Sequence, residues 1–174
     1  MINRNGIKIL SVRSTLLLEK YYAEKIAFLT VTSVLFAGCA SIPTEQAQIS
    51  DVLKQVQPPA NDKAGLYIYR SNSVVGASLK KDVWIDDECV GETARGTFFH
   101  QEVQGNTTHK VSTESEFSPN DLMVNTTAGQ NYFIKQYIKP GVFVGGAGLK
   151  LVSEAEGKEA ISELKLGVKG KCSK

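Results

Sequence analysis

Hydrophobic and polar residues alternate in short runs from residue 65 onward, which is the two-residue period of half-buried β-strands. In the first run, residues 66–69, aromatic and β-branched side chains occupy both faces, and this predicts a central strand. The acidic triplet 86–88 predicts the turn of a hairpin. Further strands are predicted at 83–85, 89–92, 97–100, 107–113, 122–126, 132–138 and 148–152.

Near the C-terminus the spacing of the hydrophobic residues changes from that of a strand to that of a helix. Ser153 can accept a hydrogen bond at the start of a helix, and Glu154 and Glu156 suit the positive end of its dipole. One apolar stripe follows, formed by Ala160, Ile161 and Leu164. Short strands at regular spacing and one terminal helix predict a mainly β fold over residues 65–174. We expect an antiparallel β-sandwich of about seven strands with a short C-terminal helix.

An apolar run at residues 26–36 follows Lys20 and Lys25. It is too short to cross a bilayer, which takes roughly 20 residues, but it fits the apolar region of a signal peptide, roughly 7 to 15 residues long. Residues 1–38 are therefore predicted to be a signal peptide. Because the basic lead-in is long, we expect the true start near Leu18, with an N-terminal extension before it.

The end of this segment, Ala-Gly-Cys at 37–39, resembles the lipobox of bacterial lipoproteins. In such proteins the cysteine thiol is joined to diacylglycerol and becomes the first mature residue. Phe36 stands where leucine is usual, and Ala40 resembles the sorting pattern for the outer membrane. The resemblance implies lipidation of Cys39, with membrane lipid as a partner and a location at the outer membrane facing the periplasm. A free Cys39 after an uncleaved anchor is the alternative.

Residues 39–64 are predicted to form a lipidated tether, because they are polar and contain Pro43 and the Pro58-Pro59 pair. Four apolar residues are spaced i, i+3, i+4, i+7 and would allow one or two helical turns. They are Ile49, Val52, Leu53 and Val56. A disordered spacer is the alternative.

The composition, 42% hydrophobic and 22% charged, is ordinary for a globular protein. Five basic and two acidic residues precede Cys39. Removing them from the 20 basic and 18 acidic residues leaves 15 and 16, a net charge of −1. A nearly neutral body argues against a nucleic-acid partner, since such proteins need clustered Lys and Arg.

Several segments together resemble a family of bacterial lipoproteins of unknown function, DUF2846. They are LYIYR at 66–70, VWID at 83–86, Gly91-Glu92, GTFF at 96–99, His109, GQNYF at 129–133 and residues 154–161. The likeness covers most of 58–166. The part with Asp86, Gly91 and His109 is also similar to PEGA-type β-sandwich modules. One departure lies at 104–109, where a Pro-Gly is expected close to the histidine. The resemblance implies a fold and a location but no activity.

Two cysteines, Cys89 and Cys172, remain after Cys39. An exported chain meets an oxidising compartment, so the pair predicts a disulfide between the C-terminal tail and the predicted strand 89–92. Two unpaired thiols are the alternative.

The residues that could carry chemistry also have plainer interpretations. His100 and His109 are the only histidines, which is too few for a metal site of ordinary ligand spacing. The acidic residues 86–88 could bind a cation, but a solvated turn is favoured. The glycine-rich stretch 141–148 is not in P-loop register, so a flexible loop or edge bulge is expected. Seven aromatic residues could line a ligand face or form the core: Tyr67, Tyr69, Trp84, Phe98, Phe99, Tyr132 and Tyr137.

We therefore expect a membrane-anchored periplasmic module with a non-enzymatic binding or scaffolding role, contacting another envelope protein or a glycan. No catalytic residue, metal ligand or cofactor is assigned. The alternative is an envelope hydrolase with an unidentified active site, in which His100 or His109 would act with a carboxylate.

Overall fold

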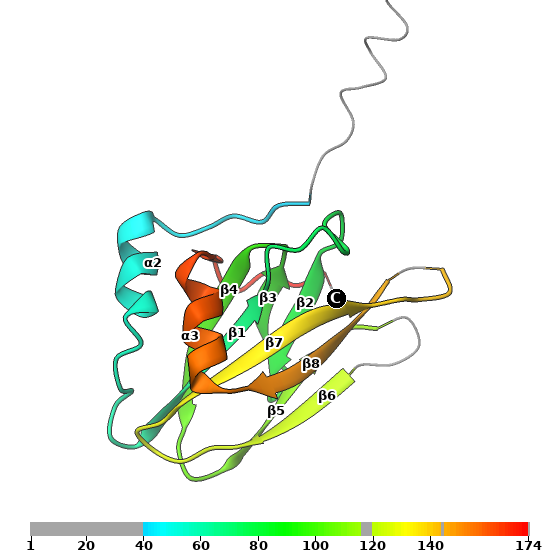
Figure 1. Ribbon diagram of the computed structural model, residues 1–174. Coiled ribbons are helices and arrows are strands. Elements are labelled where there is room, and N and C mark those ends of the chain that lie inside the picture. The colour runs from blue at the N-terminus through cyan, green and yellow to red at the C-terminus, as the bar shows by residue number, and fades with distance from the viewer. Residues whose placement is uncertain (1–39, 116–119, 144, 174) are drawn as a thin grey trace, which may run out of the picture. The chain divides into compact units, whose positions relative to one another are not determined.

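The computed structural model describes residues 40–115, 120–143 and 145–173, and it is a β-sandwich of two sheets (Figure 1). The first sheet has the strand order β8-β7-β1-β4-β9 and the second the order β3-β2-β5-β6. The predicted sandwich is therefore confirmed. The short strand β9 lies outside the predicted runs.

The first sheet is built around β1 (Lys63–Arg70), which lies between β4 and β7 and is buried at every position after Lys63. This confirms the predicted central strand. Its pairing with β7 is parallel, as is that of β4 with β9. Parallel neighbours need a long connection, and here the chain visits the second sheet between β1 and β7. The other strands are β4 (Thr97–Gln104), β7 (Asn131–Lys139), β8 (Gly146–Val152) and β9 (Lys165–Leu166).

The second sheet consists of β2 (Lys81–Ile85), β3 (Glu88–Thr93), β5 (Thr108–Thr113) and β6 (Asn120–Asn125). All its pairs are antiparallel. The predicted hairpin joins β2 to β3 through Asp86 and Asp87, whose φ angles are +50° and +66°. Positive φ at both central residues is what a two-residue type I′ hairpin loop requires, and aspartate tolerates it.

The core lies between the two sheets, and a second apolar layer lies under the helices. Leu66, Ile68 and Phe99 of the first sheet pack against Val83 and Val111 of the second. Four of the seven aromatic residues are core residues, Tyr67, Tyr69, Phe98 and Phe99. Trp84 and Tyr132 are half-buried and Tyr137 is exposed.

The C-terminal helix forms as predicted. Helix α3 (Glu154–Ser162) begins after Ser153, whose side chain accepts a hydrogen bond from the Glu156 N–H. Ile161 and Leu164 are buried in the outer apolar layer. Neither α3 nor helix α2 (Ala47–Lys54) is long and apolar enough to cross a membrane, and no other helix is present in the described ranges.

The segment 40–62 is bound to the sandwich, which differs from the predicted tether. Of the two alternatives for this segment, the helical one forms, as α2. Val56 is buried beside α3, and Ser50 accepts a hydrogen bond from the Leu166 N–H. Thr44 forms a β-bridge with Gly167. The segment stays attached because its apolar and hydroxyl side chains find partners on the outer face of the first sheet. Cys39 lies outside the described residues.

The sandwich has two ends. At the entry end, Ala40 donates a hydrogen bond to the Ala77 carbonyl in the loop 71–80, which joins β1 to β2. The hairpin 140–145 between β7 and β8 is at this same end, on the right in Figure 1. At the turn end lie the Asp86-Asp87 turn, the last residues of β4 and the start of β5.

Candidate functional site

His109 and Asp86, which belong to the segments that carry the family resemblance, meet at the turn end. The Nδ1 atom of His109 lies 2.6 Å from Asp86 Oδ2, and its Nε2 lies 2.8 Å from the Gln104 carbonyl oxygen. Asp86 Oδ1 accepts a hydrogen bond of 2.9 Å from the Lys110 N–H. The side chain of His109 is 8% exposed, so this histidine ties the β2–β3 turn to the ends of β4 and β5.

Both nitrogens of His109 therefore face acceptors. A neutral imidazole has one N–H and donates to only one of these two acceptors at a time, but both ring nitrogens are directed at protein oxygens. In this arrangement neither nitrogen is free to take a proton from a substrate. The pair acts as a clamp on the turn.

The pKa of the Asp86 carboxyl is lowered. Burial acts to raise it, but the hydrogen bonds from His109 and from the Lys110 N–H, with the nearby positive charges, outweigh burial. A carboxyl whose pKa is lower in the folded than in the unfolded state stabilises the fold at every pH above the unfolded-state pKa, which is 3.8 for Asp86. This stabilisation is lost as the pH falls through the folded-state pKa.

Asp86→Asn is expected to lower the free energy of unfolding at neutral pH by about 1 kcal/mol or less, because the carboxylate is half exposed. Asparagine keeps the left-handed backbone of the turn. Urea unfolding at several pH values should show the difference from wild type shrinking below pH 3.8. The matched control is Asp87→Asn, because Asp87 pairs with Lys110 in solvent at 79% exposure. Equal losses for both variants would contradict the clamp.

A shallow pocket of about 280 Å³ opens beside this clamp, between the end of β4 and the β2–β3 turn. Its walls combine aliphatic groups with carboxylates and amides. They are Ile85, Asp86, Glu88, Cys89, Val90, Gln101, Glu102, Val103, Gln104 and His109. No serine or threonine is among them, and Cys89 is bonded to Cys172. The pocket is therefore suited to contacts with an apolar or cationic group rather than to nucleophilic attack.

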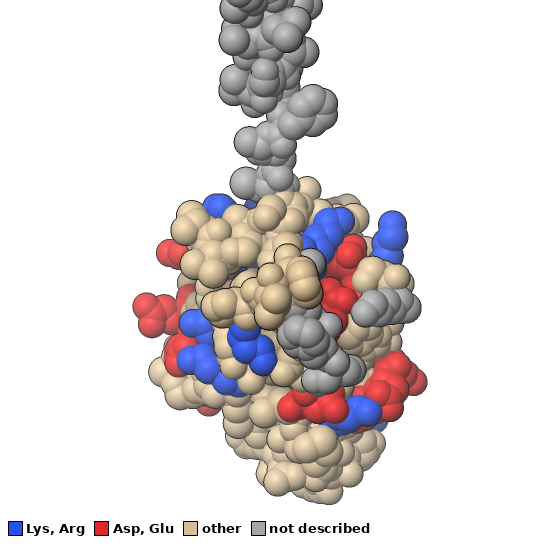
Figure 2. All heavy atoms as spheres, turned by 90° about the vertical axis from the view of Figure 1, so that its right-hand side faces the viewer, with Lys and Arg blue, Asp and Glu red and all other residues tan. Residues whose placement is uncertain are grey.

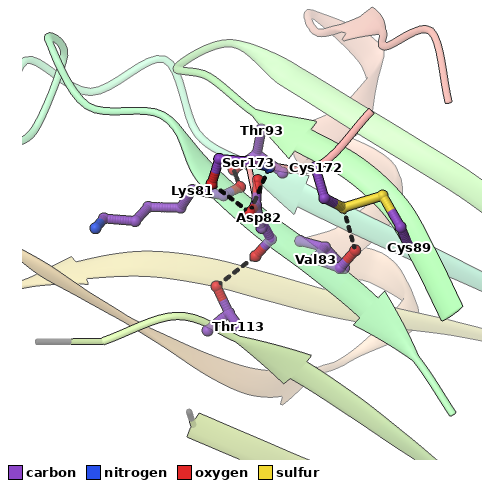
Figure 3. The surroundings of a disulfide bond; sticks show 8 residues. All are labelled: Lys81, Asp82, Val83, Cys89, Thr93, Thr113, Cys172 and Ser173. Carbon is purple, nitrogen blue, oxygen red and sulfur yellow. Dashed lines mark hydrogen bonds between the residues drawn. A yellow bond between two sulfur atoms is a disulfide. The ribbon is translucent and has the colours of Figure 1, made fainter. Parts of the chain in front are cut away.

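The predicted disulfide forms between Cys89 and Cys172, which are 83 residues apart in sequence, and the prediction is confirmed. It holds the C-terminal tail along β3, where the Gly170 N–H donates to the Val90 carbonyl and the Glu92 N–H donates to the Lys171 carbonyl. Figure 3 shows the bridge beside β2, with the Cys172 sulfur directed at the Val83 carbonyl. The tail therefore covers the β3 edge of the second sheet.

Asp82 is a buried acidic residue that the sequence did not single out. Its side chain accepts two hydrogen bonds at Oδ2, from the backbone N–H and from the hydroxyl of Ser173 (Figure 3). Its Oδ1 has no hydrogen-bond partner in the described part of the chain. Asp82 and Ser173 are 91 positions apart, so no local pattern could have paired them.

A buried polar network joins the two sheets near the entry end. Gln136 of β7 donates to the Thr113 hydroxyl at 2.7 Å, and its side-chain carbonyl accepts from Thr93 of β3. Thr113 donates in turn to the Asp82 carbonyl at 2.8 Å. Buried polar groups need such partners, and together they fix how the sheets are aligned.

His100, the other candidate histidine, lies apart from the clamp. Its ring packs on Tyr67 with the ring centroids 4.5 Å apart. Burial, and then the positive charge of Lys169, lower the pKa of His100 to about 4, although Glu102 acts to raise it. The side chain is therefore neutral at pH 7.

This shift predicts an acid-sensitive fold. Between pH 4 and 6.5 the unfolded chain binds a proton at His100 that the folded protein does not, so stability falls as the pH drops through this window. Urea unfolding across the window should show this slope in the wild type and a smaller one in His100→Gln. An unchanged slope in the variant would contradict the assignment.

The other candidate groups lie in ordinary surroundings. Among the described residues no three His, Cys, Asp or Glu side chains gather as metal ligands would. Asp87 of the acidic turn pairs with Lys110 at 2.7 Å. The glycine-rich stretch belongs to the β7–β8 hairpin, where a Cβ on Gly148 would come within 2.7 Å of the Tyr137 ring. Close packing accounts for that glycine.

Comparison with known proteins places the chain in a family. Residues 60–147 match the family described as "Protein of unknown function (DUF2846)". The chain belongs to the DUF2846 family. A protein of Haemophilus influenzae strain Rd, described as an uncharacterized protein, is 49% identical over 136 residues, which cover 78% of this chain and 80% of that protein. No solved structure matches. The PEGA likeness and the lipobox of this DUF2846 protein stay predictions.

Proposed function

We propose that this DUF2846 protein is a lipoprotein anchored through Cys39, whose sandwich is a non-enzymatic binding or scaffolding module facing the periplasm at the outer membrane. Two or more acyl chains hold a protein stably on a membrane, so the domain would not need a transmembrane helix to stay there. The partner would be another envelope protein or a glycan, contacted through the pocket at the turn end.

The observation that carries the binding role is the pocket itself. The Asp86-His109 clamp and the Cys89–Cys172 disulfide hold its walls in place. Preorganised walls favour binding because few side chains have to be ordered when a partner arrives. Glu88 and Glu102 at the rim are exposed and favour a partner that presents a cationic or hydrogen-bond-donating group.

The hydrolase alternative rests on the 2.6 Å contact between His109 and Asp86. The contact of Nε2 with the Gln104 carbonyl weighs against it, because a general base needs a nitrogen that can reach the proton it abstracts. A nucleophilic hydroxyl or thiol is also missing from the pocket wall. We therefore propose that the clamp is structural.

Anchoring is tested by mass spectrometry of the membrane fraction. The wild-type chain should begin at Cys39 and carry an acyl mass on it. Cys39→Ala should lack that mass and keep the residues before position 39. A wild-type chain that retains residues 1–38 without an acyl mass would refute the anchor.

The binding role is tested by photo-crosslinking in cells. A photoreactive amino acid in place of Glu102, at the pocket rim, should give a recurrent adduct. The same amino acid in place of Lys150 is the control, because Lys150 is exposed on β8, at the opposite edge of the first sheet from the β4–β9 side. Recovery of uncrosslinked monomer alone from the Glu102 position would refute a pocket partner.

A further inference from the structure

The loop 71–80 at the entry end is held in one conformation by a buried arginine. Arg70 is 3% exposed and donates a hydrogen bond of 2.7 Å to the Leu79 carbonyl and another to the Gly76 carbonyl. Gly76 has a φ of +69°, and a Cβ there would come within 2.6 Å of Ile138. The loop is therefore built against β7 rather than left to solvent.

This fixed loop nevertheless exposes apolar side chains. The four most exposed large apolar residues of the described chain are Phe143 at 87%, Val74 at 80%, Val142 at 73% and Val75 at 63%. Two belong to the loop 71–80 and two to the hairpin 140–145. We call these four residues the apolar tips. The loop and the hairpin touch, because a Cβ on Gly145 would come within 2.8 Å of the Leu79 side chain.

The described chain begins beside the loop 71–80, which carries two of the apolar tips. Ala40 donates its hydrogen bond to Ala77, within the loop 71–80. Cys39 is the residue just before Ala40, and neighbouring Cα atoms are about 3.8 Å apart. The lipid attachment point is therefore one residue away from the residue that contacts the loop 71–80. The segment that would otherwise serve as a spacer, 40–62, is bound along the sandwich. An acylated Cys39 would therefore bring the bilayer to the apolar tips.

We propose that the apolar tips dock on the lipid bilayer beside the acylated Cys39. This inference rests on the proposed anchor. Contiguous exposed apolar groups on a soluble domain mark an interaction surface, and the attached acyl chains make its contact with lipid intramolecular, so that even weak insertion is populated. Figure 2 looks onto the hairpin side of the molecule, where uncharged and charged residues are interspersed.

The proposal also sets the orientation of the domain. β1 runs from the turn end to the entry end over 8 residues, which is roughly 25 Å of strand. With the apolar tips on the membrane, the pocket beside Asp86 and His109 faces away from it. A partner in the periplasm could then reach the pocket without approaching the lipid.

The test places a photoreactive amino acid at single exposed positions of the full chain in bacterial cells. Val74 and Val142 are the test positions. Met123 is the control, because it is an apolar residue of similar exposure, 61%, that pairs with Lys110 toward the turn end. Crosslinked lipid is detected by mass spectrometry of the labelled peptide, and acylation of Cys39 is measured in the same samples.

Lipid adducts at Val74 and Val142, with none above background at Met123, would support docking. An acylated Cys39 without lipid adducts at either test position would overturn docking and leave the anchor standing. Recurrent protein adducts in place of lipid would assign the apolar tips to a protein partner and overturn the proposal. So would equal lipid adducts at all three positions. A Cys39 without an acyl mass would overturn the anchor and the docking with it.

Discussion

Replacing both Cys89 and Cys172 with serine is expected to lower the free energy of unfolding by about 4 kcal/mol. The disulfide closes a loop with a sequence separation of 83, and the cross-link removes chain entropy from the unfolded state. Without it the tail keeps only its backbone hydrogen bonds to β3 and the contacts of Ser173 with Asp82. Urea unfolding of the oxidised wild type and the double variant measures the difference.

The control for this experiment is a reducing agent. It should lower the unfolding midpoint of the wild type to that of the double-serine variant and leave the variant unchanged. Oxidised wild type and variant that unfold at the same urea concentration would show that the bridge contributes nothing to stability.

Phe99→Ala is expected to destabilise the fold by about 3–5 kcal/mol. Phe99 is fully buried between the sheets, and its ring lies against two glycines. A Cβ on Gly91 would come within 2.9 Å of the ring, and one on Gly167 within 2.6 Å. Truncation to alanine would leave a cavity between β4, β3 and the segment after β9. Small movements of the neighbouring backbone cannot fill a cavity of this size.

Phe143→Ala is the matched control for this core prediction. It removes the same side chain from a position that is 87% exposed, so we expect a change within about 0.5 kcal/mol. Thermal or urea unfolding of both variants in one buffer compares them directly. Similar losses for the two would mean that Phe99 is not a central part of the core.

The alternation of hydrophobic and polar residues predicted most of the strands, because a strand with one buried face has a hydrophobic residue at every second position. Leu66, Ile68 and Tyr69 mark β1 as covered on both sides, and Ser153 marks the start of α3. The cysteine pairing was also predictable, since a chain that is predicted to be exported and keeps two cysteines allows one bridge. The strand order was not, because parallel pairing of β1 with β7 depends on contacts that no local period records.

The candidate site was predictable only in part, for a similar reason. The family resemblance pointed to Asp86 and His109, but their partner Gln104 contributes a backbone carbonyl, which any residue type would supply. Asp82 was missed because its role depends on Ser173 in the distant tail. The attachment of residues 40–62 to the sandwich was not predictable, because α2 is held by Tyr67, whose hydroxyl donates to the Leu53 carbonyl, and by other residues of the sandwich.

The segment after α3 has a consequence for the order of folding. Residues 165–170 complete β9, bridge back to Thr44 and continue along β3, so the last part of the chain joins the first to the middle. Synthesis runs from the N-terminus, and contacts of such large sequence separation form slowly. The contacts of residues 165–170 with β4, with Thr44 and with β3 are therefore the last of the fold to form, so the edge at β3 and the segment before α2 are completed after the rest of the sandwich.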